Sequence, residues 1–390
     1  MTPETLALLR TPDGVNALTA AAEVAAGDPL AAASALRSRG IGADLAAAAL
    51  TQVDLRRRAR AKFGAAAEQM FFTRAGLEQA TRAVVAARRA ARLAAAGVKT
   101  MADLGCGLGS DALAAASAGI FVYAVDADPL TAEIARENAS ALGLADRVTV
   151  RCADATTVRV EDYDAVFADP ARRRAGRGRV FDPRSYSPPW EFVAALAGRV
   201  PRTVLKLAPG IDHALLPAGA EGEWVSVDGD LVEAAFWGGP LAETPRRATL
   251  LPSGAQLTGS GTARAPVGPV GAYLFDPDPA VVRSHLVAEF AAAVGGRLAD
   301  PEIAYVYADE PADTPFGRRL EITDVLQFSL KRLRALLRER GVGRLEIRKR
   351  GSALEPDRLR RDLRLAGPEA ASLVLTRVAG APTALLCRPL

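Results

Sequence analysis

The sequence has few of the residues that most often bind metals or form disulfides. Its 390 residues include two histidines and three cysteines, Cys106, Cys152 and Cys387. The cysteines form no CxxC pair and no disulfide framework, and two histidines are too few for the usual zinc ligand sets. We therefore expect no metal site and no structural disulfide.

Long apolar runs are also missing. No stretch of about 20 uninterrupted apolar residues occurs, so we expect no membrane span. The N-terminus, MTPETLALLRTPDG, lacks the basic start and apolar run of a signal peptide. We expect a cytoplasmic protein, and the sequence leaves its oligomeric state open.

The net charge is small, at +4, so its distribution matters more than its total. Basic residues concentrate in an Arg- and Gly-rich segment, Arg172–Arg184, and in a second segment, 331–364. Both suit a phosphate-bearing partner such as RNA. A solvated polar loop or helix surface would carry similar charge, so this alternative stays open.

Residues 1–95 read as a helical N-terminal region. The segments ETLALLR, PLAAASALRSRG and ADLAAAALTQVDLRRRARAKF place apolar residues at helical spacing, with Gly or Asp between them. The next pattern predicts a single helix that starts after an N-cap at Thr73 and stops at Gly97.

Residues 96–240 change to alternating strands and helices. We expect strands at 100–105, 120–126, 147–154, 163–169 and 203–210, with helices at 109–118 and 128–142. This alternation predicts a doubly wound parallel α/β sheet. Asp228-Gly229 then predicts a tight turn in a hairpin over 223–237, which would give the sheet an antiparallel edge.

Residues 241–268 are rich in Gly, Pro, Thr and Ser, and we interpret them as a linker. Beyond them we expect a second, small α/β unit. Its predicted helices are 281–296, 325–341 and 356–367, and its predicted strands are 303–309, 344–351, 371–380 and 382–390.

The loop DLGCGLG, Asp103 to Gly109, follows a predicted strand and precedes a helix. Gly105 and Gly107 allow a tight turn close to a ligand, a pattern that dinucleotide folds also use. Asp103 would repel a dinucleotide's phosphates but suit a cationic amino acid group. Asp126 and Asp154 end the next two strands, where acids can bind ribose hydroxyls and an adenine amino group. Alternatively, these acids only cap helices.

The motifs DLGCGLG, VYAVDAD, VRCAD and FADPAR, within residues 70–240, resemble those of class I S-adenosylmethionine-dependent methyltransferases. The resemblance implies a Rossmann-like methyltransferase sheet and S-adenosyl-L-methionine as cofactor. It also implies a set of cofactor contacts: Asp103, Gly105 and Gly107 at the methionine end, Asp126 at the ribose, and Ala153 and Asp154 at the adenine.

The segment FFTRAGLEQAT resembles the part that precedes these motifs in bacterial relatives of the cap trimethylguanosine synthases. By that resemblance, Phe72, Thr73 and Gln79 close over the cofactor. The alternative is a helix that packs on the sheet through Leu77.

Two short stretches compete for the catalytic position. Ser187-Pro188-Pro189-Trp190 has the letters of an amino-methylase signature, but it precedes a helix, for which Ser187 would be the N-cap. Asp169-Pro170-Ala171-Arg172 follows the fourth predicted strand, where that signature belongs. We therefore take Asp169, Pro170 and Arg172 as the candidate catalytic residues.

The stretch Asp169–Arg172 departs from the amino-methylase pattern, because Ala171 and Arg172 replace a proline and an aromatic residue. Asp169 can still accept hydrogen bonds or a proton, and Arg172 can stack on a base or hold a phosphate. Some uridine carbon methylases carry Asp-Pro-Pro-Arg but also need a cysteine nucleophile. No cysteine follows the fifth strand within this domain, which disfavours that mechanism and leaves the acceptor undefined.

Residues 341–390 resemble a THUMP-like domain, and residues 269–340 the ferredoxin-like module beside it. THUMP domains generally bind RNA. The combined expectation is a cofactor-dependent methyltransferase for a base in tRNA or rRNA, with Lys206 contacting the substrate. A methyltransferase for a protein or a small molecule, or a non-catalytic cofactor- or RNA-binding protein, remains an alternative.

Overall fold

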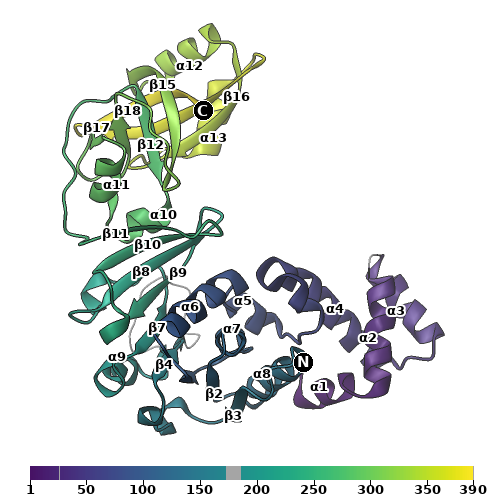
Figure 1. Ribbon diagram of the computed structural model, residues 1–390. Coiled ribbons are helices and arrows are strands. Elements are labelled where there is room, and N and C mark those ends of the chain that lie inside the picture. The colour runs from purple at the N-terminus through teal and green to yellow at the C-terminus, as the bar shows by residue number, and fades with distance from the viewer. Residues whose placement is uncertain (26, 173–185, 390) are drawn as a thin grey trace. The chain divides into compact units, whose positions relative to one another are not determined.

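The structure, a computed structural model, describes residues 1–25, 27–172 and 186–389 (Figure 1). The chain divides into two compact units. The first contains Met1–Ala220 and Ala235–Ala242, and the second contains Glu221–Ala234 and Glu243–Leu390. The helical N-terminal region and the parallel sheet therefore belong to one unit.

Residues 1–68 of the first unit are helical, as predicted. The helices are α1 (Pro3–Leu9), α2 (Pro12–Val24), α3 (Pro29–Ser38) and α4 (Ala43–Phe63), followed by the 3₁₀ helix η1 (Gly64–Glu68). The first three each begin with a proline after a capping residue, Thr2, Thr11 or Asp28. Figure 1 shows these helices in purple and blue.

The single helix expected from Thr73 to Gly97 is in fact two helices, α5 (Arg74–Gln79) and α6 (Ala83–Ala95). Thr73 is the N-cap of α5, as predicted, and accepts a hydrogen bond from the Gly76 N–H at 3.0 Å. The helix ends early because the Lys62 ammonium binds the carbonyls of Leu77, Glu78 and Ala80, each at 2.8 Å. The Lys62 side chain from α4 thus makes hydrogen bonds to carbonyls that a further helical turn would otherwise have bound.

The parallel sheet of the first unit matches the five predicted strands. They are β1 (Thr100–Leu104), β2 (Phe121–Asp126), β3 (Val148–Cys152), β4 (Ala165–Ala168) and β7 (Thr203–Leu207), in the order β7-β4-β1-β2-β3. Helices α7 (Ser110–Ser117) and α8 (Pro129–Ala141) make the first two crossovers, and α9 (Trp190–Arg199) precedes β7. This is the predicted doubly wound α/β fold.

The predicted hairpin is present, with β8 (Glu221–Val227) and β9 (Asp230–Trp237) joined by Asp228-Gly229. The expected linker, 241–268, instead contains two strands, β10 (Arg246–Leu251) and β11 (Ala255–Gly259). β10 pairs in parallel with β8 and antiparallel with β11. The local Gly and Pro content is typical of a linker. The strand β10 depends on pairing with β8, which comes from an earlier part of the chain, so the local sequence did not predict it.

The second unit also contains a seven-stranded sheet in the order β13-β14-β12-β15-β18-β17-β16. Its strands are β12 (Tyr273–Pro277), β13 (Arg297–Leu298), β14 (Val306–Ala308), β15 (Gly317–Gln327), β16 (Val342–Lys349), β17 (Glu369–Val378) and β18 (Ala381–Pro389). Its helices are α10 (Pro279–Arg283), α11 (Val287–Ala293), α12 (Leu330–Glu339) and α13 (Pro356–Leu363).

Two helix predictions in this unit were wrong. The helix expected at 281–296 is interrupted and forms α10 and α11. The helix expected at 325–341 begins only at Leu330, because residues 325–327 end the unpredicted strand β15. β15 pairs with β12 on one side and β18 on the other, so one sheet joins the two expected modules, 269–340 and 341–390.

Candidate active site

Four charged side chains lie near the carboxyl ends of the parallel strands. Asp103 lies on β1, Asp126 ends β2, Asp169 follows β4 and Lys206 lies on β7. In a parallel sheet these ends share one edge, where α/β folds bind their ligands. The structure therefore brings together three acids that were predicted from separate motifs.

The glycine loop between β1 and α7 lies directly against the chain at Asp169. Gly105 has φ +88°, and a Cβ atom there would lie 3.2 Å from the Asp169 carbonyl oxygen. Gly107 has φ +56°, and its N–H donates to Asp126 Oδ2 at 3.0 Å. Both positions need glycine because other residues disfavour this backbone conformation.

The Asp103 carboxyl group is buried, and the charge of Arg89 compensates only part of the cost. The Asp103 side chain is 1% exposed, and within the described chain its Oδ1 atom has no hydrogen-bond partner. Burial raises the pKa of Asp103 well above its usual value, and the charges of Asp111, Asp169 and Asp126 raise it further. A cationic ligand group would satisfy this carboxylate, which is a fit for the cofactor's amino acid end.

Asp126 holds the glycine loop in place. Its two oxygens accept hydrogen bonds from the N–H groups of Gly107 and Asp128, each at 3.0 Å. Burial raises the pKa of Asp126, and these two hydrogen bonds partly offset the shift. A carboxylate accepts about four hydrogen bonds, so Asp126 can also bind ribose hydroxyls.

Ala153 and Asp154 follow β3 at the same edge. The Ala153 N–H donates to the Asp126 carbonyl at 3.1 Å, which fixes the chain next to Asp126. Asp154 is exposed and caps the short 3₁₀ helix η2 (Ala155–Thr157), with its Oδ1 bound to the Thr156 N–H at 2.8 Å. Its contact with adenine remains a prediction.

Phe72 lies in the core. Its side chain is fully buried, and its ring lies 5.5 Å from that of Phe63 between centroids. Gln52 of α4 binds both main-chain groups of Phe72, at 3.1 and 2.8 Å. Phe72 is therefore a packing residue, and Thr73 is the capping residue that starts α5.

Helix α5 packs on the glycine loop. A Cβ atom on Gly76 would lie 2.7 Å from the Leu108 side chain, so helix and loop are in close contact. The buried Asn138 of α8 binds both main-chain groups of Phe71 and the Leu108 carbonyl. The segment before α5 is thereby tied to the loop, and its closure over the cofactor remains a prediction.

An ion pair lies at the predicted catalytic position. The Lys206 ammonium is 2.6 Å from Asp169 Oδ2, and it also donates to the Gln79 carbonyl at 3.4 Å. The Asp169 side chain is 34% exposed, so it remains accessible to a substrate. Lys206 therefore links the end of α5 to the acid that follows β4.

The two competing stretches are neighbours. Ala171 and Arg172 form β5, which pairs antiparallel with β6 (Tyr186–Ser187), and Ala171 lies opposite Ser187. The prediction that Ser187 caps the following helix was wrong, because α9 begins at Trp190 after a cap at Pro189. Pairing with Ala171 places Ser187 in a strand instead. Pro170 is buried, whereas the Arg172 side chain and residues 173–185 lie outside the described part of the chain.

Sequence reasoning missed the residues that hold the site together. Gln52, Lys62 and Asn138 act through main-chain groups of distant segments. The buried pair of Arg89 and Asp111, at 3.0 Å, fixes α6 against α7. A single amide or lysine within a helix belongs to no local motif, so the sequence offered no signal for these residues.

Comparison with known proteins assigns the chain. It is 37% identical over 351 residues to an uncharacterized S-adenosylmethionine-dependent methyltransferase of Mycobacterium tuberculosis (strain ATCC 25618 / H37Rv), which covers 86% of this chain and 95% of that protein. This chain belongs to the S-adenosylmethionine-dependent methyltransferases. The methyltransferase domain profile matches residues 101–172, from β1 to β5.

Further matches cover the rest of this methyltransferase. A THUMP domain-like profile matches residues 317–389, from β15 to β18, and a domain of unknown function matches residues 2–59. A crystal structure from Porphyromonas gingivalis W83, provisionally assigned as a methyltransferase, shares the fold with a TM-score of 0.72 and 22% identity, over 90% of this chain and 92% of that one. The methyltransferase also resembles a 23S rRNA (uracil(1939)-C(5))-methyltransferase of Acidithiobacillus ferrooxidans, at 35% identity over 105 residues, which is 25% of this chain and 24% of that protein.

The cofactor of this methyltransferase is S-adenosyl-L-methionine. Within the described residues, no helix combines the length and the hydropathy that a membrane span requires. Nor do these residues contain a group of three or more His, Cys, Asp or Glu side chains that could hold a metal ion.

Proposed function

We propose that this methyltransferase transfers a methyl group to a base in RNA, either tRNA or rRNA. The observation that carries the proposal is the THUMP-like match over β15–β18, on a sheet whose helices present unpaired basic side chains. THUMP domains generally bind RNA, so such a surface would present RNA to the methyl-transfer site.

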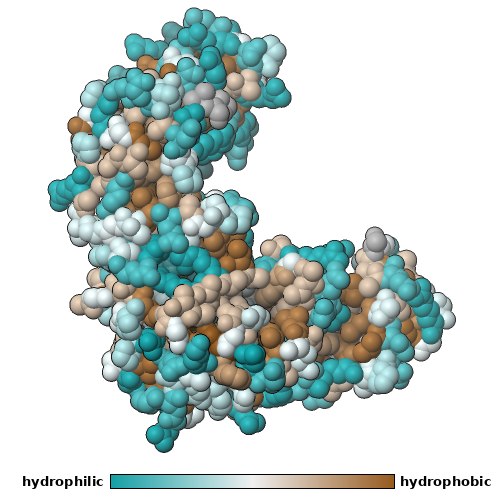
Figure 2. All heavy atoms as spheres, viewed as in Figure 1, coloured by the Kyte–Doolittle hydropathy of each residue, from teal (hydrophilic) through white to brown (hydrophobic). Residues whose placement is uncertain are grey.

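Helices α12 and α13 bury leucines on one side and turn charge outward. Leu333 and Leu337 of α12 are buried, as are Leu359 and Leu363 of α13. Six exposed cations of the second unit have no carboxylate within 4 Å among the described residues: Lys331, Arg332, Arg338, Arg344, Arg361 and Arg364. In Figure 2 the surface at α12 and α13 is mostly hydrophilic. Unpaired cations of this kind bind phosphate groups and release counterions.

In this proposal the cofactor site consists of the residues assigned from the sequence. Asp103, Gly105 and Gly107 hold the methionine end, Asp126 the ribose, and Ala153 and Asp154 the adenine. When bound, the cofactor supplies a methyl group on a positively charged sulfur. The buried Asp103 fits the cationic amino acid end, because its carboxyl oxygen has no other partner among the described residues.

Asp169 orients or deprotonates the acceptor. Its carboxylate is partly exposed beside the glycine loop, and Lys206 holds one oxygen in place. The other oxygen can accept a hydrogen bond from the acceptor group. Pro170 fixes the turn after Asp169, and we assign Arg172 to a base or phosphate of the RNA, by stacking or ion pairing.

Cysteine-dependent carbon methylation does not fit this site. The cysteine after β7 is Cys387, which lies in the second unit and is 1% exposed. Burial raises its pKa to about 12, so it is a thiol and not a nucleophilic thiolate at neutral pH. The similarity to an rRNA uracil methyltransferase supports RNA as the substrate class but does not extend to its chemistry.

The proposal is tested by comparing modified nucleosides in total RNA from a wild-type strain and a deletion strain. Mass spectrometry should show one methylated nucleoside lost in the deletion strain. Expression of the wild-type gene should restore it, and expression of the Asp169→Ala variant should not. An unchanged set of modified nucleosides would contradict the proposal.

A further inference from the structure

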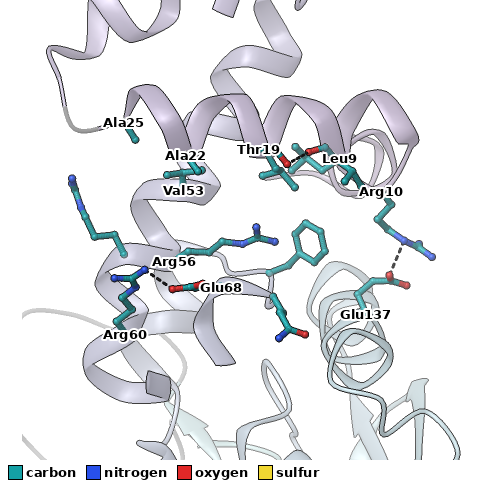
Figure 3. Close-up of a pocket in the computed structure, with 15 residues that line it drawn as sticks. Leu9, Arg10, Thr19, Ala22, Ala25, Val53, Arg56, Arg60, Glu68 and Glu137 are labelled. Atoms are coloured by element: carbon teal, nitrogen blue, oxygen red, sulfur yellow. Dashed lines mark hydrogen bonds and ion pairs between the residues drawn. The ribbon is translucent and has the colours of Figure 1, made fainter. Parts of the chain in front are cut away.

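A cavity of about 790 Å³ lies in the first unit, between α2 and α4, and shares no residue with the candidate active site. Figure 3 shows it in close-up. Its lining comes from α1, α2, α4, α8, η1 and the segment before α5. Most of the lining residues lie in the region that matches a domain of unknown function.

One side of the cavity is apolar. Leu9, Leu18 and Ala22 line it from α1 and α2, and Val53 lines it from α4. Figure 2 shows hydrophobic residues where α2 and α4 lie side by side. Such walls favour a ligand with an apolar or aromatic surface.

Arg56 occupies the centre of the cavity in Figure 3. Its Nε donates to the Met70 carbonyl at 2.9 Å, and its guanidinium lies 5.2 Å from the centre of the Phe71 ring. One face of the guanidinium thus contacts an aromatic ring, and the rest of the group faces the cavity. Burial lowers the pKa of Arg56 because the positive charge loses water, and the nearby charge of Glu68 offsets only part of this shift.

The other cations around the cavity are neutralised. Arg10 lies 2.7 Å from Glu137, Arg57 lies 2.7 Å from Asp54, and Arg60 pairs with Glu68. Among the described residues, Arg56 has no carboxylate within 4 Å. Among the described arginines that line the cavity, Arg56 is therefore the one without a direct ion pair, and it lies next to apolar walls.

Gln69 adds a hydrogen-bonding group to the same cavity. Its side chain is exposed, and its amide has no hydrogen-bond partner within the described chain. An amide offers a donor and an acceptor together, as needed to bind the edge of a nucleobase. A long-chain fatty acid would use neither this pair nor the planar face of Arg56.

We propose that this cavity binds a nucleotide. The base lies between the apolar walls and stacks on Arg56, and its edge faces Gln69. The phosphate lies towards Arg57 and Arg60, whose ion pairs are exposed and therefore readily rearranged. Bases commonly stack on arginine in this way. The site is separate from methyl transfer, so the proposal holds whether or not RNA is the methyl acceptor.

The test is a fluorescence titration of the full chain with N-methylanthraniloyl-AMP, displaced by unlabelled AMP. We expect saturable binding that is about tenfold weaker in Arg56→Met and weakened in Gln69→Ala, because stacking and base-edge contacts are lost. Ala22→Phe should abolish binding by filling the cavity from an exposed position. Arg58→Met is the matched control, since Arg58 lies on the same helix, pairs with Asp54 and does not line the cavity.

Ala22→Phe and Gln69→Ala change exposed side chains, so these two variants test nucleotide binding in the cavity even if the Arg56→Met variant does not fold. A fluorescein-labelled oligoribonucleotide identifies the source of the nucleotide. Displacement of the labelled AMP by the oligonucleotide assigns the site to RNA, and its absence assigns the site to a free nucleotide. The proposal is overturned by equal binding to wild type and Ala22→Phe, by no saturable binding up to about 10 mM, or by equal displacement with decanoate.

Discussion

At the scale of single residues, Asp103 has the most unusual environment in the site. Its buried carboxyl group lacks a partner for Oδ1 among the described residues, and burial together with three nearby acids raises its pKa. A raised pKa means that the proton competes with any cation for this carboxylate. In the proposed site, cofactor binding and pH are therefore coupled at Asp103.

We predict that cofactor affinity falls as the pH is lowered, over a range above that of an ordinary aspartate. Below the raised pKa, Asp103 is neutral and no longer attracts the cofactor's ammonium group. Asp103→Asn should bind about tenfold more weakly at high pH and lose this pH dependence, since one charged hydrogen bond contributes roughly 1.5–3 kcal/mol. Isothermal titration calorimetry over a pH series measures both effects.

The control for Asp103 is Asp128→Asn. Asp128 is exposed and caps α8, and asparagine also caps helices well. This variant should keep the wild-type affinity and pH dependence. If Asp103→Asn showed the same pH dependence as the wild type, the coupling would lie elsewhere.

At the same scale, Lys206 positions Asp169 through their 2.6 Å ion pair. We predict that Lys206→Met lowers the rate of methyl transfer by roughly 10²-fold, comparable to the loss of acid–base assistance. Cofactor affinity should change less than the rate, because the contact of Lys206 with the segment expected to close over the cofactor is the longer one, at 3.4 Å to the Gln79 carbonyl against 2.6 Å to Asp169. Lys206→Arg should restore part of the rate.

Steady-state kinetics with tritiated cofactor separate the role of Asp169 in methyl transfer from the role of Lys206 in positioning Asp169. Asp169→Ala should remove transfer while leaving cofactor binding intact. A Lys206→Met enzyme with wild-type kcat would show that the ion pair does not support catalysis.

At the scale of elements, α5 connects the N-terminal helices to the catalytic edge. Lys62 of α4 binds three carbonyls at the end of α5, and Lys206 binds a fourth, that of Gln79. Burial lowers the pKa of Lys62, and the nearby charge of Lys206 lowers it further. The helix end therefore lies between two cations, one of which also pairs with Asp169.

We predict that Lys62→Met destabilises the protein by about 1–3 kcal/mol, since two partly buried carbonyls and one exposed carbonyl lose their partner. It should also weaken cofactor binding, because α5 packs on the glycine loop. Urea unfolding and calorimetry measure the two effects. Arg74→Ala is the control: Arg74 is exposed on α5, and its replacement should change stability by less than about 0.5 kcal/mol.

Elements with local signals could be predicted from the sequence. The five parallel strands, the Asp228-Gly229 hairpin and the Thr73 cap each depend on residues that are adjacent in the chain. The acids of the site could be predicted too, because the end of each parallel strand fixes where the next residue lies.

Elements that depend on partners distant in the chain could not be predicted from the sequence. The break between α5 and α6 depends on Lys62, and β10 depends on pairing with β8. Ser187 was misplaced because its partner, Ala171, lies on the other side of an Arg-rich segment. The hydrogen bonds of Gln52 and Asn138 join four segments that no spacing rule connects: α4, α8, the segment before α5 and the glycine loop.

At the scale of the whole molecule, charge on the second unit governs the proposed RNA binding. Lys331, Arg332 and Arg338 are unpaired and exposed on α12. We predict that replacing all three by Ala weakens RNA binding and reduces the slope of log affinity against log salt by about 2–3, since each phosphate contact contributes roughly 0.7–0.9. Filter binding at several salt concentrations measures the slope.

A matched control replaces three cations of the same unit that are ion-paired. Arg318, Arg340 and Arg360 lie 3.1, 2.8 and 2.8 Å from Glu346, Asp324 and Asp357. Their combined replacement should change the slope less. Equal slopes for both triple variants would place the RNA on another surface.

The most direct test of the account is methyl transfer in vitro. Purified enzyme is incubated with tritiated S-adenosyl-L-methionine and RNA from the deletion strain, and the RNA is then digested to nucleosides. The account predicts tritium in one methylated base, with none transferred by Asp169→Ala although that variant still binds the cofactor. Transfer to protein or to a small molecule, with no label in RNA, would contradict it.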